Sequence, residues 1–239
     1  KAYGTDAVPV AIGMRYGNPS IPAALEQLTA QNVRNIVVLP LYPQYCAATV
    51  GSTFDAVATE LKKYRWVPEL KFISGYHQNP KYIGAICRSI EQHIAEHGMP
   101  DKLIMSFHGT PEFYLKKGDP YFCFCSQTSR LVREKLKLEE DRVMLTFQSR
   151  FGKAPWLQPY TDATLKSLPA QGIKHVAIIC PGFSADCLET IEEIESENHD
   201  YFIEAGGQTF HYIPCLNDND AHIDMMMDLV QQHLPPRQA

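Results

Sequence analysis

The stretch Cys180–Glu197, CPGFSADCLETIEEIESE, joins an apolar segment to a carboxylate-rich one, and it decides how the rest of the chain is interpreted. Pro181-Gly182 interrupts the apolar run, and Asp186 with Glu189 three residues later is similar to the capping box that begins many helices. We therefore predict a strand end, a tight loop and a helix over residues 186–203. Such a helix would carry four acids on one face, at close to one-turn spacing: Asp186, Glu189, Glu193 and Glu197.

Two interpretations of this acidic face are open. Leu188, Ile191 and Ile194 lie roughly opposite the acids, which is the pattern of an ordinary amphipathic helix with its acids in water. Against that, like charges at i, i+4 repel by about 0.2–0.5 kcal/mol per pair, and no lysine or arginine lies between Lys174 and Arg237. Acids in the first turn are also kept ionised by the helix dipole, which suits a proton acceptor or an oxygen ligand for a metal.

The composition is that of a globular chain with a local excess of acid. Its 239 residues are 45% hydrophobic and 21% charged, enough for one large or two small domains with their own cores. The net charge is −5, yet residues 1–174 hold 21 basic and 15 acidic residues, whereas residues 175–239 hold 1 and 12. A segment of that charge attracts cations and repels nucleic acid, so we expect no nucleic-acid partner.

Seven cysteines, an odd number at low density, fit a reducing compartment better than a disulfide framework. We therefore expect an intracellular protein. No apolar run reaches the ~20 residues that span a bilayer, and no signal-peptide pattern opens the sequence. Because the sequence begins at Lys1 without an initiator methionine, we expect a fragment or a trimmed chain.

Apolar segments with strand character alternate along the chain with segments of helical periodicity. The predicted strands are residues 8–13, 35–39, 70–74, 102–107, 142–147, 175–180 and 209–213. The predicted helices are residues 19–31, 51–64, 82–96, 127–136, 162–171, 186–203 and 220–233. This alternation indicates an α/β fold of parallel sheets with right-handed crossovers.

Two small sheets fit this alternation better than one large sheet. A helix ends in glycine and proline at residues 97–100, HGMP, just before a new strand, which marks a domain boundary. We therefore predict two similar Rossmann-like domains, residues 1–99 and 100–239, each a parallel sheet flanked by helices. Polar or glycine-rich residues follow the strands, and ligands of parallel sheets bind at the carboxyl ends of strands. We expect these loops to converge on one cleft, which is the predicted active site.

Individual side chains suggest a limited chemistry. His108 in SFHGTP follows an apolar strand directly and is the best single candidate for a base, although a histidine at a strand end is often only structural. Trp156, in a proline-flanked loop, is either a core residue or a flat surface for a planar ligand. Cys123 and Cys125 form a CxC pair without a second pair at ligand spacing. Walker, GxGxxG, HExxH and GxSxG motifs are absent. A histidine that faces an acidic helix suits metal handling or proton abstraction.

Several long blocks of the sequence resemble the ferrochelatase family, most closely its bacterial branch. They are MRYGNPSI from Met14, LPLYPQYCAATVGS from Leu39, SFHGTP from Ser106, TFQSRFGKAPWLQPYTD from Thr146 and PGFSADCLETIEEI from Pro181. The resemblance implies two similar chelatase-type α/β domains with a porphyrin cleft between them. It also implies insertion of ferrous iron into protoporphyrin IX to form protohaem, with release of two protons, as the last step of haem biosynthesis. Roughly the first quarter of the family's chain is expected to be missing from this sequence.

The resemblance also implies roles for particular residues. His108 and Glu189 match the pair usually given as the iron site, and base and iron ligand both remain open as the role of His108. Asp186, Glu193 and Glu197 match an acidic proton or metal relay. The residues implied in the porphyrin cleft are Arg15, Tyr16, Tyr42, Trp156 and Phe183. Cys187 stands where other relatives carry histidine.

The resemblance further implies no tightly bound cofactor, with Fe²⁺ as a substrate. We expect no iron–sulfur cluster, because Ala47 occupies the matching loop position and the tail from His222 to Ala239 contains no cysteine. The implied location is the cytoplasm, with peripheral contact with the membrane face left open. Two alternatives remain: a non-catalytic tetrapyrrole-binding fragment, or a chelatase for another tetrapyrrole or metal.

Overall fold

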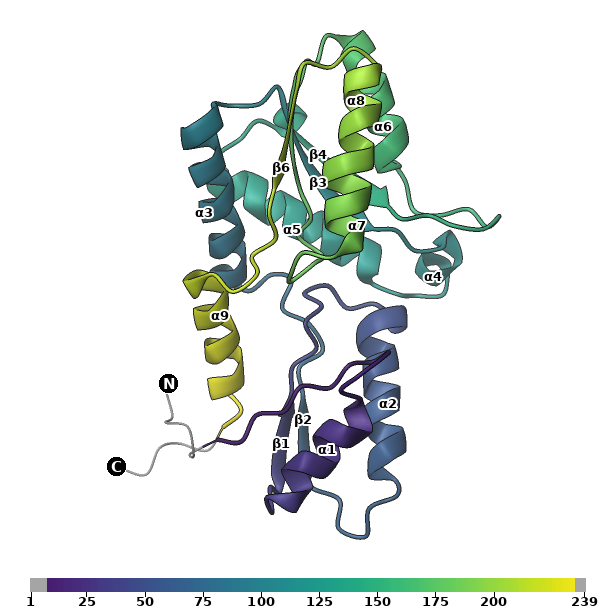
Figure 1. Ribbon diagram of the computed structural model, residues 1–239, viewed down its shortest axis with the longest axis vertical. Coiled ribbons are helices and arrows are strands. Elements are labelled where there is room, and N and C mark those ends of the chain that lie inside the picture. Colours follow the sequence, from purple (N-terminus) through teal and green to yellow (C-terminus); the bar gives the residue numbers. More distant parts are fainter. Residues whose placement is uncertain (1–7, 235–239) are drawn as a thin grey trace. The chain divides into compact units, whose positions relative to one another are not determined.

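The computed structural model describes residues 8–234 of the chain, and the contacts among them define two units (Figure 1). Of the described residues, unit 1 contains 8–40, Cys46–Gly75 and 229–234. Unit 2 contains Leu41–Tyr45 and Tyr76–Asp228. The predicted boundary at residues 97–100 follows helix α3 (Pro80–His97), whereas this division assigns α3 to unit 2, where it packs against a helix and a strand.

Unit 1 is built on a two-stranded parallel sheet. Strands β1 (Asn35–Val38) and β2 (Glu69–Phe72) pair with Ile36 opposite Leu70. The flanking helices are α1 (Ile21–Ala30) and α2 (Ser52–Leu61), and a short π-helix, η1 (Ala47–Gly51), precedes α2. The core of the unit consists of apolar residues from β1 and both α-helices: Ile21, Leu25, Ile36, Val57 and Leu61. From α1 onward, the predicted alternation of helices and strands in this region is confirmed.

The strand predicted at residues 8–13 is wrong. These residues are not in a strand, and Met14 forms only an isolated parallel bridge with Ser20. Val10 and Ile12 are 78% and 69% exposed. A strand requires a neighbour that satisfies its backbone hydrogen-bonding groups, and β1 pairs only with β2 among the described residues. The apolar pattern of these residues alone was therefore not sufficient to predict a strand.

Unit 2 contains a four-stranded parallel sheet in the order β4-β3-β5-β6. The strands are β3 (Lys102–His108), β4 (Val143–Gln148), β5 (His175–Ile179) and β6 (Thr209–Ile213). All four lie within a residue of the predicted ranges. Because the strands are parallel, the residues that follow His108, Gln148 and Ile179 emerge at the same edge of the sheet.

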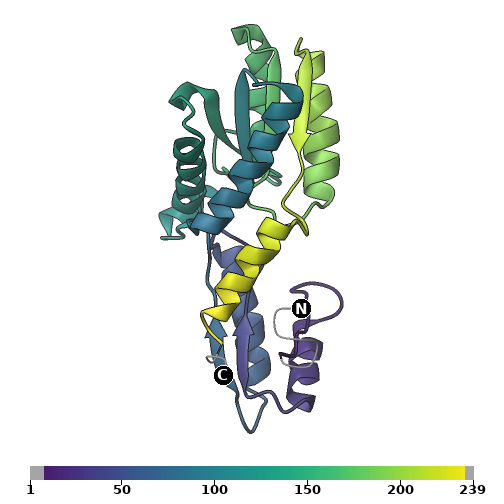
Figure 2. The same cartoon turned by 90° about the vertical axis from the view of Figure 1, so that its left-hand side faces the viewer.

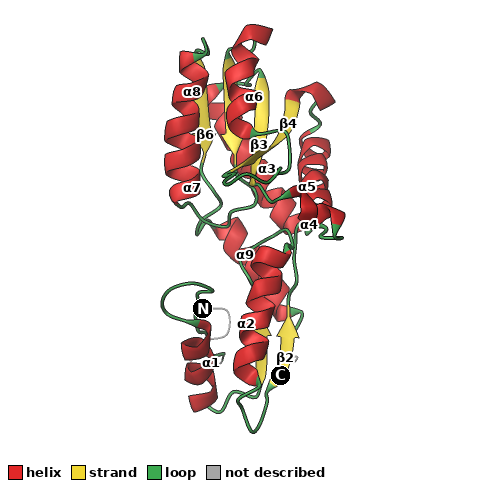
Figure 3. Cartoon of the chain, turned by 90° about the vertical axis from the view of Figure 1, so that its right-hand side faces the viewer, coloured by secondary structure: helices red, strands yellow, loops and turns green. Residues whose placement is uncertain are grey.

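Helices cover both faces of this sheet. α3 packs with α5 (Tyr121–Leu136), and α6 (Thr161–Ser167) packs with α8 (His199–Glu204). Figure 2 shows α3 in front of the sheet beside β6, and Figure 3, from the opposite side, shows α6 and α8 in front of it. Further helical segments are α4 (Glu112–Lys116), η2 (Glu140–Arg142), η3 (Leu168–Gln171) and α9 (Asp220–Gln231). The parallel sheet between two helical layers confirms the Rossmann-like α/β fold class.

Alternating strand residues direct the packing of the two layers. Val176 and Ile178 of β5 pack with Leu165 of α6 and Phe202 of α8 in one buried cluster. Since successive strand residues point to opposite faces, His175, Ala177 and Ile179 face the layer of α3 and α5. On the α3 side, Ile83, Ile86 and Ile90 are buried at helical spacing, as predicted.

The acidic segment is not the regular helix predicted over residues 186–203. It consists of one α-turn, α7 (Leu188–Thr190), then a π-helix, η4 (Ile191–Asn198), then α8. The buried Asn198 donates from its side-chain amide to the backbone oxygen of Glu193, five residues earlier, at 2.7 Å. This contact has the same i→i+5 spacing that defines a π-helix. π-Helical turns occur frequently at functional sites.

Candidate active site

His108 ends strand β3 at the loop edge of the unit 2 sheet. Tyr121 donates from its hydroxyl to the backbone oxygen of His108 at 2.9 Å, which holds the strand end in place. The ring Nδ1 of His108 lies 2.7 Å from the backbone oxygen of Gly109. A carbonyl oxygen only accepts hydrogen bonds, so Nδ1 is the donor and Nε2 of the neutral ring carries the free lone pair. The geometry therefore presents Nε2 as the basic atom.

Glu189 lies opposite that atom. Its Oε1 is 3.9 Å from His108 Nε2, which is too long for a direct hydrogen bond. Its other oxygen, Oε2, accepts from the Cys187 thiol at 3.3 Å. Burial and this contact raise the pKa of Cys187, so the sulfur acts as a neutral donor. The predicted pair is thus brought together in unit 2, with a gap between its two reactive atoms.

Two aromatic rings lie near His108. The ring centres of Trp156 and Phe183 are 6.4 Å and 6.5 Å from the centre of the imidazole ring. Trp156 is buried, and its indole Nε1 has no hydrogen-bond partner among the described residues. A Cβ atom on Gly109 would lie 2.9 Å from the backbone oxygen of Gln148 and 3.0 Å from Trp156 Cε3. Glycine is therefore required for this close approach of the loop, the strand end and the indole.

Gln148 and Ser149 connect the strand ends to the acidic segment, and neither was among the predicted site residues. Gln148 pairs with His108 across β3 and β4, and its side chain is buried. Its Nε2 donates to the backbone oxygen of Glu189 at 2.6 Å, while its Oε1 accepts from Ser106 Oγ at 2.7 Å. The backbone nitrogen of Ser149 donates to Glu193 Oε1 at 2.7 Å. The position of Gln148 at the end of a strand that neighbours β3 was the available signal.

Asp186 occupies a structural position. Its Oδ1 accepts from the Tyr212 hydroxyl at 2.6 Å and from the backbone nitrogen of Cys215 at 3.1 Å, and its Oδ2 accepts from Asn217 Nδ2 at 2.7 Å. Burial raises the pKa of Asp186, but the hydrogen bonds from Asn217, Tyr212 and Cys215 outweigh burial and lower it below its usual value. The carboxylate thus connects the loop before α7 to β6 and to the segment that follows β6.

The predicted capping box at Asp186 and Glu189 is wrong by one residue. Cys187 is the N-cap of α7, and its backbone nitrogen donates to Thr190 Oγ1 at 2.9 Å. Asp186 does not cap the helix, because its oxygens accept from Tyr212 of β6 and from Asn217 in the segment after β6. Only these tertiary contacts of Asp186 distinguish an N-cap at Cys187 from one at Asp186.

The apolar side of the acidic segment also differs from the prediction. Ile194 is buried, but Leu188 is 74% exposed and Ile191 is 50% exposed. The wider turn of η4 and the position of α7 at the sheet edge move these two side chains away from the core. Exposed apolar groups beside the His108–Glu189 pair do not fit the interpretation of a purely solvated helix face.

The remaining predicted residues are distributed over both units. Glu197 is exposed on η4. Arg15 in unit 1 donates from Nε to the backbone oxygen of Ser52 at 3.0 Å, and its guanidinium lies over the Tyr16 ring, 4.5 Å from the centroid. Tyr42 is partly exposed in the Leu41–Tyr45 segment of unit 2.

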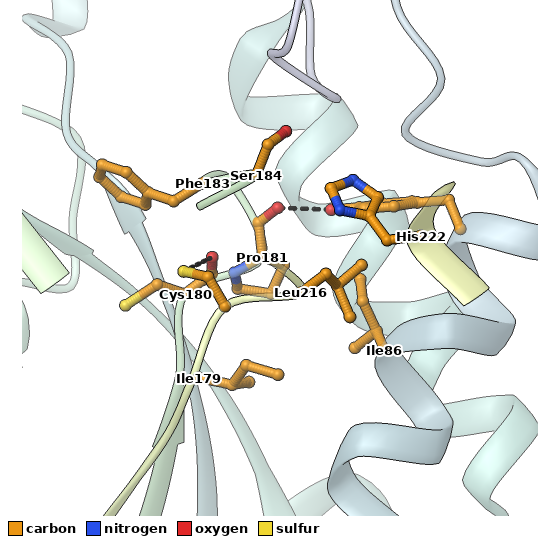
Figure 4. Close-up of a pocket in the computed structure, with 10 residues that line it drawn as sticks. Ile86, Ile179, Cys180, Pro181, Phe183, Ser184, Leu216 and His222 are labelled. Atoms are coloured by element: carbon orange, nitrogen blue, oxygen red, sulfur yellow. Dashed lines mark hydrogen bonds between the residues drawn. The ribbon is translucent and has the colours of Figure 1, made fainter. Parts of the chain in front are cut away.

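A small pocket lies beneath the loop that carries Phe183 (Figure 4). It is lined by residues of α3, β5, the loop after β5, the segment after β6 and α9: Tyr82, Ile86, Ile179, Cys180, Pro181, Phe183, Ser184, Cys215, Leu216 and His222. Tyr82 donates from its hydroxyl to the backbone oxygen of Pro181, and Ser184 donates to the backbone oxygen of Leu41 at 2.8 Å. The pocket excludes His108 and Glu189, so it supports the loop and is not the reactive site.

No helix among residues 8–234 combines the length and the apolar character needed to cross a membrane. Within the same residues, no three His, Cys, Asp or Glu side chains form a ready-made metal-binding group. The candidate site is therefore a two-residue pair, His108 and Glu189, and not a closed metal cage.

Comparison with solved structures supports the fold. SirB from Bacillus subtilis with Fe³⁺ superimposes with a TM-score of 0.66 at 14% identity, covering 95% of this chain and 83% of that one. CbiX, described as the terminal enzyme of sirohaem biosynthesis in denitrifying bacteria, superimposes with a TM-score of 0.60 at 13% identity, covering 90% and 81%. At these identities the likeness concerns the fold alone.

Comparison of the sequence is more specific. The chain is 58% identical to ferrochelatase of Hydrogenovibrio crunogenus over 232 residues and 57% identical to that of Marinobacter nauticus, with 97% of this chain covered in each case. It spans 61% and 62% of the length of those two proteins. The ferrochelatase family model matches residues 1–234. The chain therefore belongs to the ferrochelatase family.

Proposed function

We propose that this chain carries the metal-insertion site of a ferrochelatase, which places ferrous iron in protoporphyrin IX to form protohaem and releases two protons. The observation that carries the proposal is the His108–Glu189 pair, with 3.9 Å between Nε2 and Oε1 and with the rings of Trp156 and Phe183 nearby. Family membership and the names of the relatives support it.

The proton balance of the reaction requires a base. Metallation replaces two pyrrole protons by one Fe²⁺ ion, so two protons must leave the macrocycle. With its Nδ1 hydrogen directed at Gly109, His108 offers the Nε2 lone pair to one of these protons. Glu189, whose side chain is half exposed, can receive a proton from His108 and pass it to solvent.

The same pair is also suited to hold the incoming ion. Two protein ligands bound to one cation at about 2.0–2.2 Å place their donor atoms about 3–4 Å apart. The observed 3.9 Å lies at the upper end of that range. Base and iron ligand therefore both remain proposed roles for His108, and an oxygen of Glu189 would be the second ligand.

The hydrogen bonds of the acidic residues indicate different roles for them. Asp186 accepts hydrogen bonds at both oxygens, so we assign it to holding the loop rather than to the relay. Glu193 is bound by Ser149 but lies next to Glu189 in the network of Gln148, and Glu197 is exposed. We propose that Glu193 and Glu197 guide cations or protons toward Glu189, since the segment after Lys174 is strongly acidic.

The rings near His108 suit a flat, apolar substrate. A rigid aromatic wall can favour a bent macrocycle, in which the nitrogen lone pairs point toward the ion. We propose that Trp156 and Phe183 form this wall, and that Arg15, Tyr16 and Tyr42 also contact the porphyrin.

We also propose a cytoplasmic location with peripheral membrane contact. The local excess of acid in residues 175–239 again argues against a nucleic-acid partner.

The test is anaerobic incubation of the chain with ferrous iron and protoporphyrin IX, with the full-length relative from Hydrogenovibrio crunogenus as the positive control. Loss of porphyrin fluorescence together with growth of a haem spectrum is the expected result. His108→Ala should abolish that change while porphyrin still quenches tryptophan fluorescence on binding. His199→Ala is the matched control, because His199 is a half-exposed histidine on α8.

The outcomes separate the alternatives. Porphyrin binding without metallation in this chain would identify it as a tetrapyrrole-binding part, and metallation only of another tetrapyrrole would identify a different chelatase. Normal turnover of His108→Ala would refute the assignment of the site.

A further inference from the structure

Four histidines of unit 2 lie together, away from His108. His93 and His97 are one turn apart near the end of α3, His175 begins β5, and His211 is in the middle of β6. The ring centre of His211 lies 5.0 Å from that of His93, 4.4 Å from that of His97 and 5.4 Å from that of His175. The centres of His93 and His97 are 4.6 Å apart. We call these residues the histidine cluster.

The fold explains this convergence. Thr209 of β6 pairs with His175 and His211 pairs with Ala177, so the two histidines are diagonal neighbours on one face of the sheet. That face is the one covered by α3, because Val176 and Phe210 point into the opposite cluster with α6 and α8. α3 packs against β6 (Figure 2). The last two turns of α3 thus place His93 and His97 over the pair on the strands.

The ring nitrogens of the cluster are poorly satisfied. Nε2 of His93, Nε2 of His175 and Nδ1 of His211 are buried and have no hydrogen-bond partner among the described residues. The His93 side chain is largely enclosed, with the residue 9% exposed. Buried polar atoms are normally bonded, so three such nitrogens in one place call for a ligand.

The spacing of the rings fits a metal ion. A tetrahedral ion that binds imidazole nitrogens at about 2.0–2.1 Å places the centres of two such rings about 5 Å apart. The four measured separations run from 4.4 to 5.4 Å. The nitrogens do not form a ready-made group as placed, but rotation of the rings about their side-chain bonds redirects the nitrogens without moving the backbone. The His97 side chain is 44% exposed and provides a route from solvent.

We propose that His93, His97 and His211, with His175 as a fourth donor, bind one divalent transition-metal ion of the kind that prefers imidazole ligands, such as Zn²⁺ or Co²⁺. This site is separate from the proposed iron-insertion site. His175 begins β5, and the next residue, Val176, pairs with Lys102 at the start of β3. His108 ends β3, six residues after Lys102. At about 3.3 Å per strand residue the two sites are about 20 Å apart along the sheet.

The test is a titration of the untagged, EDTA-treated chain with Co²⁺ alone, under argon, followed by the visible absorption of tetrahedral cobalt. One equivalent of Co²⁺ should bind and should raise the melting temperature. His97→Ala changes an exposed residue in the last turn of α3, so the fold should be retained, and it should weaken Co²⁺ binding about tenfold or more. His97→Ala together with His211→Ala should remove the visible band.

Two controls make the result specific. His199→Ala removes a histidine of similar exposure outside the cluster, with a side chain 43% exposed, and should leave the titration unchanged. The visible band of tetrahedral cobalt should also persist in His108→Ala, because His108 lies outside the cluster. Absence of the cobalt band in the wild-type chain, its loss in His108→Ala, or its persistence in the double variant would each overturn the proposal.

Discussion

Asp186→Asn should destabilise the protein strongly, because the Asp186 carboxylate joins two separate segments of unit 2. Its two oxygens accept from Tyr212, Cys215 and Asn217 at 2.6–3.1 Å. Its own backbone nitrogen donates to Asn217 Oδ1 at 2.9 Å, so Asn217 cannot turn its amide over without losing that bond. The substitution preserves shape and removes the charge and one acceptor.

The magnitude follows from these contacts. An asparagine keeps one oxygen for the Tyr212 side, and its new NH₂ group then faces Asn217 Nδ2, so two donors oppose each other. An unsatisfied buried donor costs about 1–3 kcal/mol, and the remaining bonds lose the extra strength of a charged acceptor. We expect a loss of about 2–4 kcal/mol in the free energy of unfolding, which corresponds to a fall of about 1 M in the urea midpoint.

The same contacts predict a pH dependence. Because the folded-state pKa of Asp186 lies below its usual value, the carboxylate stabilises the fold above the unfolded-state pKa of about 3.9. That contribution should be lost as the pH falls through the folded-state pKa. Asp186→Asn should therefore flatten the acid limb of the stability curve.

The assay is urea unfolding followed by circular dichroism, at pH 7 and at a series of lower pH values. Asp200→Asn is the control, because Asp200 is an exposed carboxylate that accepts a hydrogen bond from the neighbouring His199, and it should change stability by less than about 0.5 kcal/mol. Equal stability of Asp186→Asn and the wild-type chain would refute the structural role. Loss of turnover without loss of stability would instead support a role for Asp186 in the proton or metal relay.

Three further predictions concern the site. Glu189→Gln should lower iron insertion far more than Glu192→Gln, since Glu189 lies opposite His108 and Glu192 is exposed; equal rates of loss of porphyrin fluorescence would support only the interpretation of a solvated helix face. Gly109→Ala should destabilise the fold by about 1–3 kcal/mol in urea unfolding and shift tryptophan emission, because its Cβ would lie 2.9–3.0 Å from Gln148 and Trp156; an unchanged midpoint would contradict this. Anaerobically purified protein should be colourless and free of sulfide on chemical assay, and a brown sample with stoichiometric iron and sulfide would show that the expected absence of a cluster is wrong.

Local patterns predicted most of the elements of unit 2. Ile83, Ile86 and Ile90 recur at helical spacing and are buried on α3, which begins at the Asn79 cap and ends at Gly98 with a φ of +83°. The four apolar runs of the sheet became strands because each is short, largely apolar and bounded by turn or polar residues. The position of His108 at a strand end followed from the same reasoning. Such features depend on neighbours within a few residues, which a sequence displays directly.

Long-range contacts decided the features that the pattern could not predict. Residues 8–13 have the composition of a strand, but a strand forms only where another supplies hydrogen-bond partners. The choice of Cys187 as the N-cap of α7 depends on the hydrogen bonds from Tyr212 and Asn217 to Asp186, across 26 and 31 residues. No local sequence pattern predicts which of such distant groups come into contact.

The division is clearest at the site itself. The residue types and their placement after strands were readable from the sequence, and they identified His108, Glu189 and Trp156 as candidates. Their mutual geometry required the sheet, because the pairing of His108 with Gln148 brings the Gln148 amide to the backbone of Glu189. The sequence by itself determined which chemical groups are available, since composition and local periodicity are properties of neighbours along the chain. Only the tertiary structure decided which of those groups meet, because distances across a parallel sheet depend on strand order and register.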